Sequence, residues 1–320
     1  MSSSRIRGPR TRGPVRPRRL SLSALLLGAI LLAGCGSPSA RPSAPPSITD
    51  ADYLTAERWN DGRAEVAFYR VERTRDHYGR PRPQEFLVGT YLVKHRFSPA
   101  EMTKQTDGSG VSSFKYALFY ELESGSYQYK RNWVVNARQR DLRPYKQSFT
   151  SFDWCSNQYR ELAFVPDGPI EVRMRSDDYG NRRTTLEPRA QSYPPAQIPL
   201  LVRGLDVEAT DTLSFAVAVA DSATHVPARA VHEGRDSVQT PAGTFAAERI
   251  TVTYEAPVPS PIGETSATRE TYWVGTTPQR RLLRVAAASG RYRMTLVEHL
   301  RTAYWRENLW PMLARVEERP

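Results

Sequence analysis

Strand-like runs separated by turn residues fill most of the sequence, and this pattern limits the fold more than any other feature. Between residues 64 and 301, apolar and polar side chains alternate in runs rich in β-branched and aromatic residues. Such alternation is typical of strands that bury one face and expose the other. Short segments such as "DHYGRPRP" and "ESG" separate the runs and are typical of hairpin turns. The pattern predicts a long antiparallel meander.

The runs predict a series of strands with a short helix at each end. The strands are expected at 64–75, 84–97, 112–122, 126–137, 143–152, 158–165, 170–176, 211–220, 228–240, 243–256, 268–276, 280–289 and 290–301. One helix is expected at 49–62, capped by Thr49 and ended by Gly62, and a second after Pro311. We therefore predict a mainly β fold, a large, strongly curved antiparallel sheet that forms a partly closed barrel or a sandwich.

Residues 1–34 have the layout of a bacterial export signal. Seven arginines and no acidic residue precede an apolar stretch that runs from Leu20 to Ala33. This stretch of about 14 residues is too short for a helix that crosses a bilayer, which needs roughly 20. A lasting transmembrane anchor is therefore not predicted.

The end of this leader resembles the lipobox of bacterial lipoproteins. Leu32, Ala33 and Gly34 stand directly before Cys35. The resemblance implies cleavage before Cys35 and attachment of acyl chains such as palmitate to it, and more than one buried chain anchors a protein stably. Gly36 stands where many lipoproteins retained at the inner membrane carry aspartate. The outer membrane is therefore favoured, with the protein facing the periplasm.

After the leader, the sequence divides into a tether, a domain and a tail. Residues 35–49 are rich in Ser, Pro and Ala and are expected to form a flexible tether. Residues 50–305 form the predicted β-rich periplasmic domain, which the prolines at 186–206 could divide into two halves. Within that break, 198–205 fits either a helical turn or a crossing strand. Residues 306–320 form the tail with its short helix.

Most of the excess positive charge belongs to the leader. Seven of the 45 basic residues lie there, which leaves 38 basic against 34 acidic residues in the exported part. Nucleic-acid binding depends on neutralising phosphates and is therefore not expected. The arginine-containing stretches at 79–83 and 181–183 are interpreted as solvated turns, with a functional basic patch as the alternative.

Motifs for known chemistries are missing from the sequence. It holds no nucleotide-binding glycine motif and no zinc-hydrolase spacing, and its five histidines are scattered. No metal site and no cofactor are predicted. A pair of catalytic carboxylates is found by distance in space rather than by sequence spacing, so Glu121, Glu123 and Glu161 stay open as candidates.

Cys155, next to Trp154, is the only cysteine outside the lipobox. A catalytic cysteine needs a nearby base or positive dipole, and no histidine lies within 50 residues of it in the sequence. A disulfide lacks a partner, because Cys35 is expected to be lipidated. We interpret Trp154 and Cys155 as structural residues that attach the turn between two strands to the core, with a reactive thiol as the alternative.

Two stretches resemble exported bacterial protein families without an assigned function. Residues 59–97 and 150–159 resemble β-rich lipoproteins that are sometimes labelled septum-formation inhibitor Maf, although the S-x-S-P-R-R loop of Maf pyrophosphatases does not occur here. Residues 238–252 and 271–285 are similar to a domain-of-unknown-function family of periplasmic β-proteins. Neither resemblance implies catalytic residues.

These observations favour a non-catalytic envelope lipoprotein over an enzyme. Its expected partners are the membrane, through the anchor at Cys35, and a lipid, another hydrophobic ligand or an envelope-assembly protein. Phe86, Tyr91, Phe119 and Trp133 are candidates to line a ligand cavity, with ordinary core packing as the alternative. The competing functions are a periplasmic hydrolase that uses Cys155 or a carboxylate pair, and a purely structural scaffold.

Overall fold

The computed structural model describes residues 48–77, 79–124, 127–209, 211–262 and 265–309, together with Pro311 and Val316. The leader, the lipobox and residues 35–47 of the tether lie outside the described residues. So does most of the C-terminal helix that the sequence predicts.

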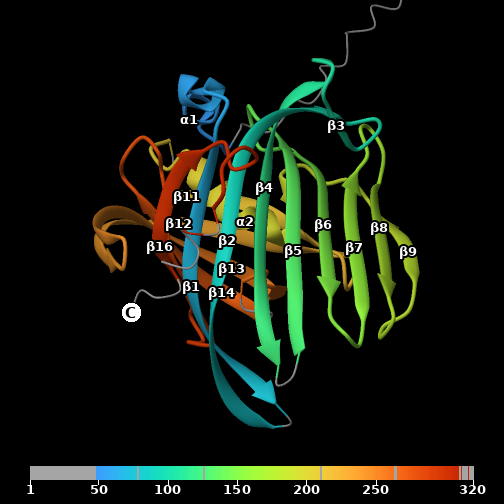
Figure 1. The fold of residues 1–320 in the computed structure, drawn as a ribbon. Helices are drawn as coiled ribbons and strands as arrows, with labels where there is room; N and C mark the ends of the chain where they lie inside the picture. Colours follow the sequence, from blue (N-terminus) through green and yellow to red (C-terminus); the bar gives the residue numbers. More distant parts are fainter. Residues whose placement is uncertain are drawn as a thin grey trace, which may run out of the picture. The chain divides into compact units, whose positions relative to one another are not determined.

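Within the described residues, 16 strands form one sheet (Figure 1). The first half of the chain supplies β1 (Ala64–His77), β2 (Arg80–Ser98), β3 (Thr103–Gln105), β4 (Val111–Ser124), β5 (Tyr127–Arg138), β6 (Pro144–Phe152), β7 (Asn157–Phe164), β8 (Ile170–Ser176) and β9 (Arg182–Leu186). The second half supplies β10 (Ser192–Tyr193), β11 (Thr212–Val219), β12 (Thr224–Thr240), β13 (Gly243–Pro259), β14 (Ser266–Gly275), β15 (Leu282–Ala287) and β16 (Tyr292–Thr302).

The strands are ordered almost as in the sequence. The sheet runs from β10 through β16, continues through β1, β2 and β4, and ends at β9, while β3 pairs with β2 alone. Neighbouring strands are antiparallel except for the short parallel pair of β10 and β11. The mainly β prediction is confirmed, and because β9 and β10 end the sheet, it is not closed. Strands from both sides of the proline-rich break belong to this one sheet.

The two ends of the open sheet overlap at a seam. Val217 and Val219 of β11 belong to the main core, whereas Ala218 packs with Leu162 and Ile170 of β7 and β8. Neighbouring residues of a strand point to opposite faces. Strands β7 and β8 therefore lie over the face of β11 that points away from the main core. The Arg160 guanidinium is 2.8 Å from the Asp221 carboxylate and links the same two ends of the sheet.

Within residues 48–309, four short helical segments accompany the sheet. They are α1 (Ala51–Thr55), η1 (Glu57–Asn60), η2 (Pro195–Gln197) and α2 (Ile198–Gly204). The helix predicted at 49–62 is present only as two short segments, α1 and η1, which Ala56 separates. Its predicted cap is wrong: Asp50, not Thr49, accepts a hydrogen bond of 3.0 Å from the Tyr53 amide. The proline-rich break contains η2 and α2, which corresponds to the helical alternative.

Helix α2 fills the concave side of the sheet. Its sequence is apolar on nearly all sides, which suits a helix surrounded by core, and all seven residues are buried. A Cβ at Gly204 would lie 2.8 Å from Leu142 Cδ1, so the packing there leaves no room for a side chain. The curved sheet therefore wraps around a solid core in this region.

The one charged residue of α2 is held by a buried ion pair. Arg203 and Glu65 lie 2.7 Å apart, with side chains only 5% and 6% exposed. Arg203 also donates to the main-chain oxygens of Arg280 and Gln279 at 2.6 and 3.1 Å. Burial by itself raises the pKa of Glu65, but Arg203 and His299 outweigh this effect and lower the pKa to about 2. The ion pair thus connects α2 to β1 in a region from which water is excluded.

Replacing Glu65 with glutamine should destabilise the protein strongly at neutral pH. Removing one partner of a buried pair costs about 3–5 kcal/mol. Because the folded-state pKa of Glu65 is lowered, its contribution is complete above about pH 4.5 and is lost as the pH falls towards about 2. Urea unfolding from pH 7 to pH 2.5 should show the deficit of Glu65→Gln shrinking below pH 4.5. Glu208→Gln, at an exposed position, is the control, and a pH-independent deficit would contradict the assignment.

Candidate functional site

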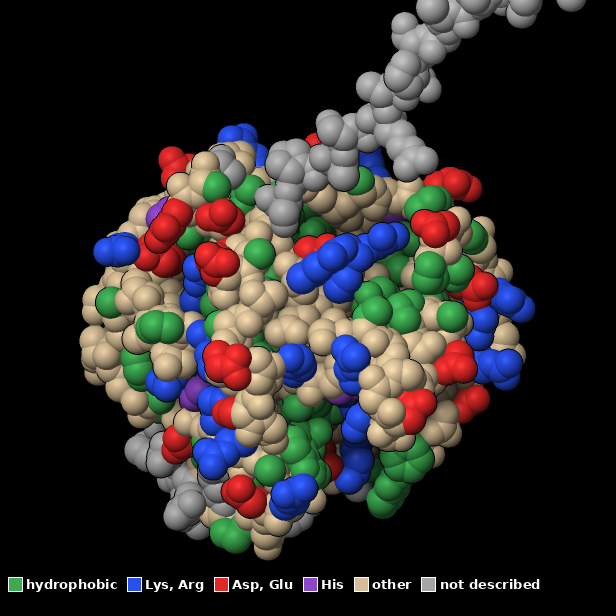
Figure 2. Space-filling model, turned by 90° about the horizontal axis from the view of Figure 1, so that it is seen from above, with side chains coloured by type: hydrophobic (Ala, Val, Ile, Leu, Met, Phe, Trp, Pro, Cys, Tyr) green, Lys and Arg blue, Asp and Glu red, His purple; other side chains and the backbone are tan. Residues whose placement is uncertain are grey.

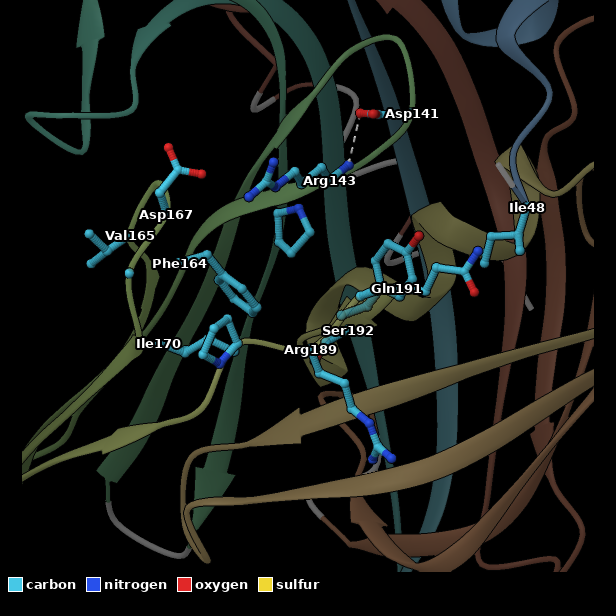
Figure 3. Close-up of a pocket in the computed structure, with 15 residues that line it drawn as sticks. Ile48, Asp141, Arg143, Phe164, Val165, Asp167, Ile170, Arg189, Gln191 and Ser192 are labelled. Atoms are coloured by element: carbon cyan, nitrogen blue, oxygen red, sulfur yellow. Dashed lines mark hydrogen bonds between the residues drawn. The ribbon is translucent and has the colours of Figure 1, made fainter. Parts of the chain in front are cut away.

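A pocket of about 700 Å³ opens beside the seam (Figure 3). Its walls come from the β5–β6 turn, the β7–β8 loop and the segment that connects β9 to β10, with Ile48 at one side. Pro166 lies within the β7–β8 loop and Pro194 directly follows β10, and neither residue can donate a hydrogen bond to a strand ladder. The pocket therefore forms where the overlapping ends of the sheet separate.

The inner wall of the pocket is apolar. Phe164 and Ile170, which face the seam from β7 and β8, contribute to it together with Tyr193 of β10. Tyr193 is 4% exposed, and its ring meets Phe215 edge to face with centroids 5.9 Å apart. The wall is thus continuous with the core, and a ligand that contacts it is shielded from water.

The rim of the pocket carries two arginines. Arg143 and Arg189 are exposed, and among the described residues neither guanidinium forms a hydrogen bond or an ion pair. Asp141 is already engaged, because Arg138 Nε donates to it at 2.7 Å. In Figure 3, Arg143 extends towards Asp167, whereas Arg189 extends away on the opposite side. Two free cations and one carboxylate, Asp167, therefore remain on the rim.

The surface around the rim has no strong excess of either positive or negative charge. Figure 2 shows this end of the sheet from above, with acidic and basic side chains interspersed and smaller groups of hydrophobic side chains between them. A large polyanion would find no continuous basic surface there. The arginines of the rim are suited to a single anionic group instead.

A serine and a histidine meet next to the pocket. Ser192, which helps to line it, has its Oγ 3.1 Å from His225 Nδ1, and His225 Nε2 lies 2.9 Å from the Glu187 carbonyl oxygen. A carbonyl only accepts, so Nε2 carries the proton of the neutral ring and Nδ1 accepts from the serine hydroxyl. This is the orientation of a general base, although Ser192 is only 4% exposed. Neither residue stands out in the sequence, because the two lie 33 positions apart.

A second polar cluster is buried away from the pocket. Glu270 accepts hydrogen bonds from the hydroxyls of Tyr254 and Tyr272 at 2.6 and 2.7 Å and from that of Tyr292. Burial, followed by the nearby Glu270 carboxylate, raises the pKa of all three tyrosines well above its usual value. The hydroxyls are therefore permanent donors that tie β13, β14 and β16 together. This cluster stabilises the sheet without facing the pocket.

The four aromatic candidates from the sequence do not gather in this pocket. Phe86 packs on the concave side, 5.1 Å from the ring of Tyr120, and Trp133 lies on the same side, 4.2 Å from the ring of Phe149.

Tyr91 and Phe119 belong to the opposite, convex face. Tyr91 packs with the separate cluster that includes Phe68, and the ring of Phe119 lies over Gly89, where a Cβ would come within 2.4 Å of it.

The predicted burial of the Trp154–Cys155 turn is wrong. The turn lies between β6 and β7 as expected, but Cys155 is exposed and Trp154 is 78% exposed. Asp153 shapes the turn instead, since its Oδ1 accepts from the amides of Cys155 and Ser156 at 2.8 and 2.9 Å. An Asx turn of this kind needs no apolar side chain to hold it.

The carboxylates considered for hydrolysis are not brought together. Glu121 pairs with Lys130 at 2.8 Å, and Glu123 is exposed. Glu161 accepts from the Tyr159 hydroxyl at 2.5 Å and lies 3.3 Å from Lys146. Strands β4 and β7 are separated by β5 and β6 in the sheet. Among the described residues, no group of three or more His, Cys, Asp or Glu side chains is placed to hold a metal ion.

Comparisons with known proteins leave the function open. No family model matches the sequence, and no curated protein matches it. A solved β-barrel-like protein of the domain of unknown function DUF1849 from Brucella abortus is similar in structure, with a TM-score of 0.48 and 10% identity over 74% of this chain and 97% of that chain. A DUF1329 family protein from Desulfovibrio piger gives a TM-score of 0.23 and 10% identity, covering 78% of this chain and 91% of that one.

Among the described residues, no helix has the length and apolar character needed to cross a membrane.

Proposed function

We propose that this protein is a lipid-anchored envelope protein that binds an amphipathic ligand in the seam pocket. The observation that carries the proposal is the pocket itself, which combines about 700 Å³ of space and an apolar wall with two arginines that have no partner among the described residues. Ligand sites commonly have this size and this mixture of apolar walls with a few polar groups. The ligand class that fits is a hydrophobic molecule with one anionic group.

The anionic group would bind at the rim and the hydrophobic part against the wall. Arg143 can form charge-assisted hydrogen bonds with a carboxylate or a phosphate, which are about twice as strong as neutral ones. Phe164, Ile170 and Tyr193 provide the apolar contact. The proposed export and anchoring at Cys35 place such a protein at the outer membrane, facing the periplasm, where lipids and lipid precursors are the obvious amphipathic molecules.

Replacing Arg143 should weaken binding of an anionic amphiphile. With the unlipidated chain of residues 36–320, titration of a fluorescent fatty acid should show Arg143→Ala weakening the affinity by about tenfold or more, since a hydrogen bond to a charged group contributes about 1.5–3 kcal/mol. Arg140→Ala, at an exposed position outside the pocket, should bind like the wild type.

The matching fatty alcohol provides the second control for this titration. Because it has no negative charge, its affinity should be nearly the same for the wild type and for Arg143→Ala. Absence of binding for both probes, or an equal loss for the Arg140 and Arg143 variants, would overturn the proposed ligand site.

Attachment of the lipid anchor should depend on Cys35 alone. In cells fed with labelled palmitate, the wild-type protein and Cys155→Ser should incorporate the label, and Cys35→Ser should not. The exported chain has no other cysteine than these two, so each variant is the control for the other. A membrane-associated Cys35→Ser protein that still carries label would contradict the lipobox assignment.

A hydrolase that uses Ser192 is the second candidate function, because His225 is oriented to accept its proton. The binding proposal predicts no adduct when the protein is treated with a fluorophosphonate, since the Ser192 side chain is nearly fully buried. Peptide mass spectrometry would detect an adduct at Ser192, with Ser192→Ala as the blank. An adduct that also disappears in His225→Gln would replace the binding proposal with hydrolysis.

A further inference from the structure

The end of the sheet away from α1, where the long hairpins turn, exposes large aromatic side chains. We call it the hairpin end; it is the lower end of the sheet in Figure 1, with the tips of β1–β2, β4–β5, β6–β7 and β8–β9. Phe152, Trp154 and Tyr179 are 52%, 78% and 68% exposed. They account for three of the five exposed large hydrophobic side chains among the described residues.

Neighbouring tips are joined, so these aromatic residues act as one surface. The Asn157 amide in the β6–β7 turn donates to Asp177 Oδ2 of the β8–β9 tip at 2.9 Å. The ring of Trp154 stacks on Tyr127 of the β4–β5 tip, with centroids 6.1 Å apart. The aromatic side chains therefore project from a connected rim rather than from independent loops.

Arginines surround the same rim. The β8–β9 hairpin carries a groove of about 390 Å³ that is lined by Arg173, Met174, Arg175, Asn181, Arg182 and Arg183. Arg173 is neutralised by Glu171, whose Oε2 lies 2.6 Å from its guanidinium. Arg182 donates to the main-chain oxygen of Asp221 at 2.9 Å, which leaves its charge uncompensated.

The acidic residues of this tip accept hydrogen bonds from neutral donors within the rim, so they keep their negative charge and offset part of the positive charge of the arginines. Asp177 accepts from the Asn157 amide, and Asp178 accepts from Gln158 Nε2 at 3.2 Å. By contrast, Arg175 is exposed and has no hydrogen bond or ion pair among the described residues.

The β1–β2 tip adds further positive charge at the same end. Arg75, Arg80 and Arg82 are exposed there, and Arg75 lies directly opposite Arg82 in the ladder. The carboxylate nearest to them in the sequence, Asp76, accepts from the Gly79 amide at 2.7 Å. The two arginine-containing stretches at 79–83 and 181–183 thus lie at the same end of the molecule, although about 100 residues separate them in the sequence.

We propose that the hairpin end is a membrane-surface site that docks on a bilayer containing anionic phospholipid. Exposed tryptophan, tyrosine and phenylalanine side chains insert into the interfacial region of a bilayer, and arginines next to them bind headgroup phosphates. Narrow projecting tips suit a soft lipid surface, whereas a protein partner requires a broad complementary face. The inference is independent of the seam pocket, which lies at the opposite end of the strands.

Vesicle binding of the unlipidated chain tests this proposal. The chain of residues 36–320 keeps every described residue, and its one cysteine, Cys155, lies on the proposed surface. A polarity-sensitive fluorophore on Cys155 should shift to the blue with vesicles of phosphatidylcholine and phosphatidylglycerol, and much less with phosphatidylcholine alone. The same fluorophore at Thr106→Cys, in a Cys155→Ser background, should not respond, because that loop lies at the other end of the strands.

Matched variants distinguish insertion of these side chains from nonspecific binding to vesicles. In a sedimentation assay with the mixed vesicles, Trp154→Ser should lower the partition coefficient on the order of tenfold. Trp305→Ser, at a 51% exposed position on the opposite end, should leave the partition coefficient unchanged.

Arg175→Gln should lower the partition coefficient about fivefold at low salt, and Arg140→Gln should not. Failure of the wild type to bind the mixed vesicles, or equal losses for the paired variants, would overturn the proposal.

Discussion

The buried ion pair between Arg203 and Glu65 is the interaction on which the rest of the architecture depends. An open sheet of this length has no hydrogen bonds between its two end strands. Its curvature therefore has to be stabilised by packing on its concave side. Helix α2 provides this packing, and its single charge is tolerated in the core only because Glu65 of β1 and two main-chain oxygens satisfy it. The curvature of the sheet and the position of the helix are therefore coupled.

The pocket follows from this arrangement. Helix α2 is buried on the concave side, and the two ends of the sheet overlap rather than pair edge to edge. The overlap buries Leu162 and Ala218 between the layers, but at one end the connecting segments separate and leave a cavity. The candidate site therefore lies at the seam. In a ligand carrier with a hollow barrel, the site would lie in the centre of the barrel instead.

The opposite ends of the strands present two different surfaces. At one end lies a pocket whose rim carries a few charges of both signs, and at the other end exposed aromatic residues stand next to arginines. A protein that is anchored by a lipid, holds an amphipathic ligand and touches the bilayer with its hairpin tips would remain close to the source of that ligand. The proposed anchor, ligand site and docking surface use separate sets of residues.

The sequence by itself determined the mainly β class, the hairpins and most of the strand positions, because alternation and turn residues are local signals. It did not indicate β3, β9 or β10, which are too short to show a pattern, and it misplaced Trp154 and Cys155, because an exposed and a buried aromatic residue look alike in sequence. Only the tertiary structure decided that Ser192 meets His225 and that Arg143 borders the apolar wall formed by Phe164 and Ile170. Those contacts arise where the sheet overlaps itself, and such long-range pairings have no local sequence pattern.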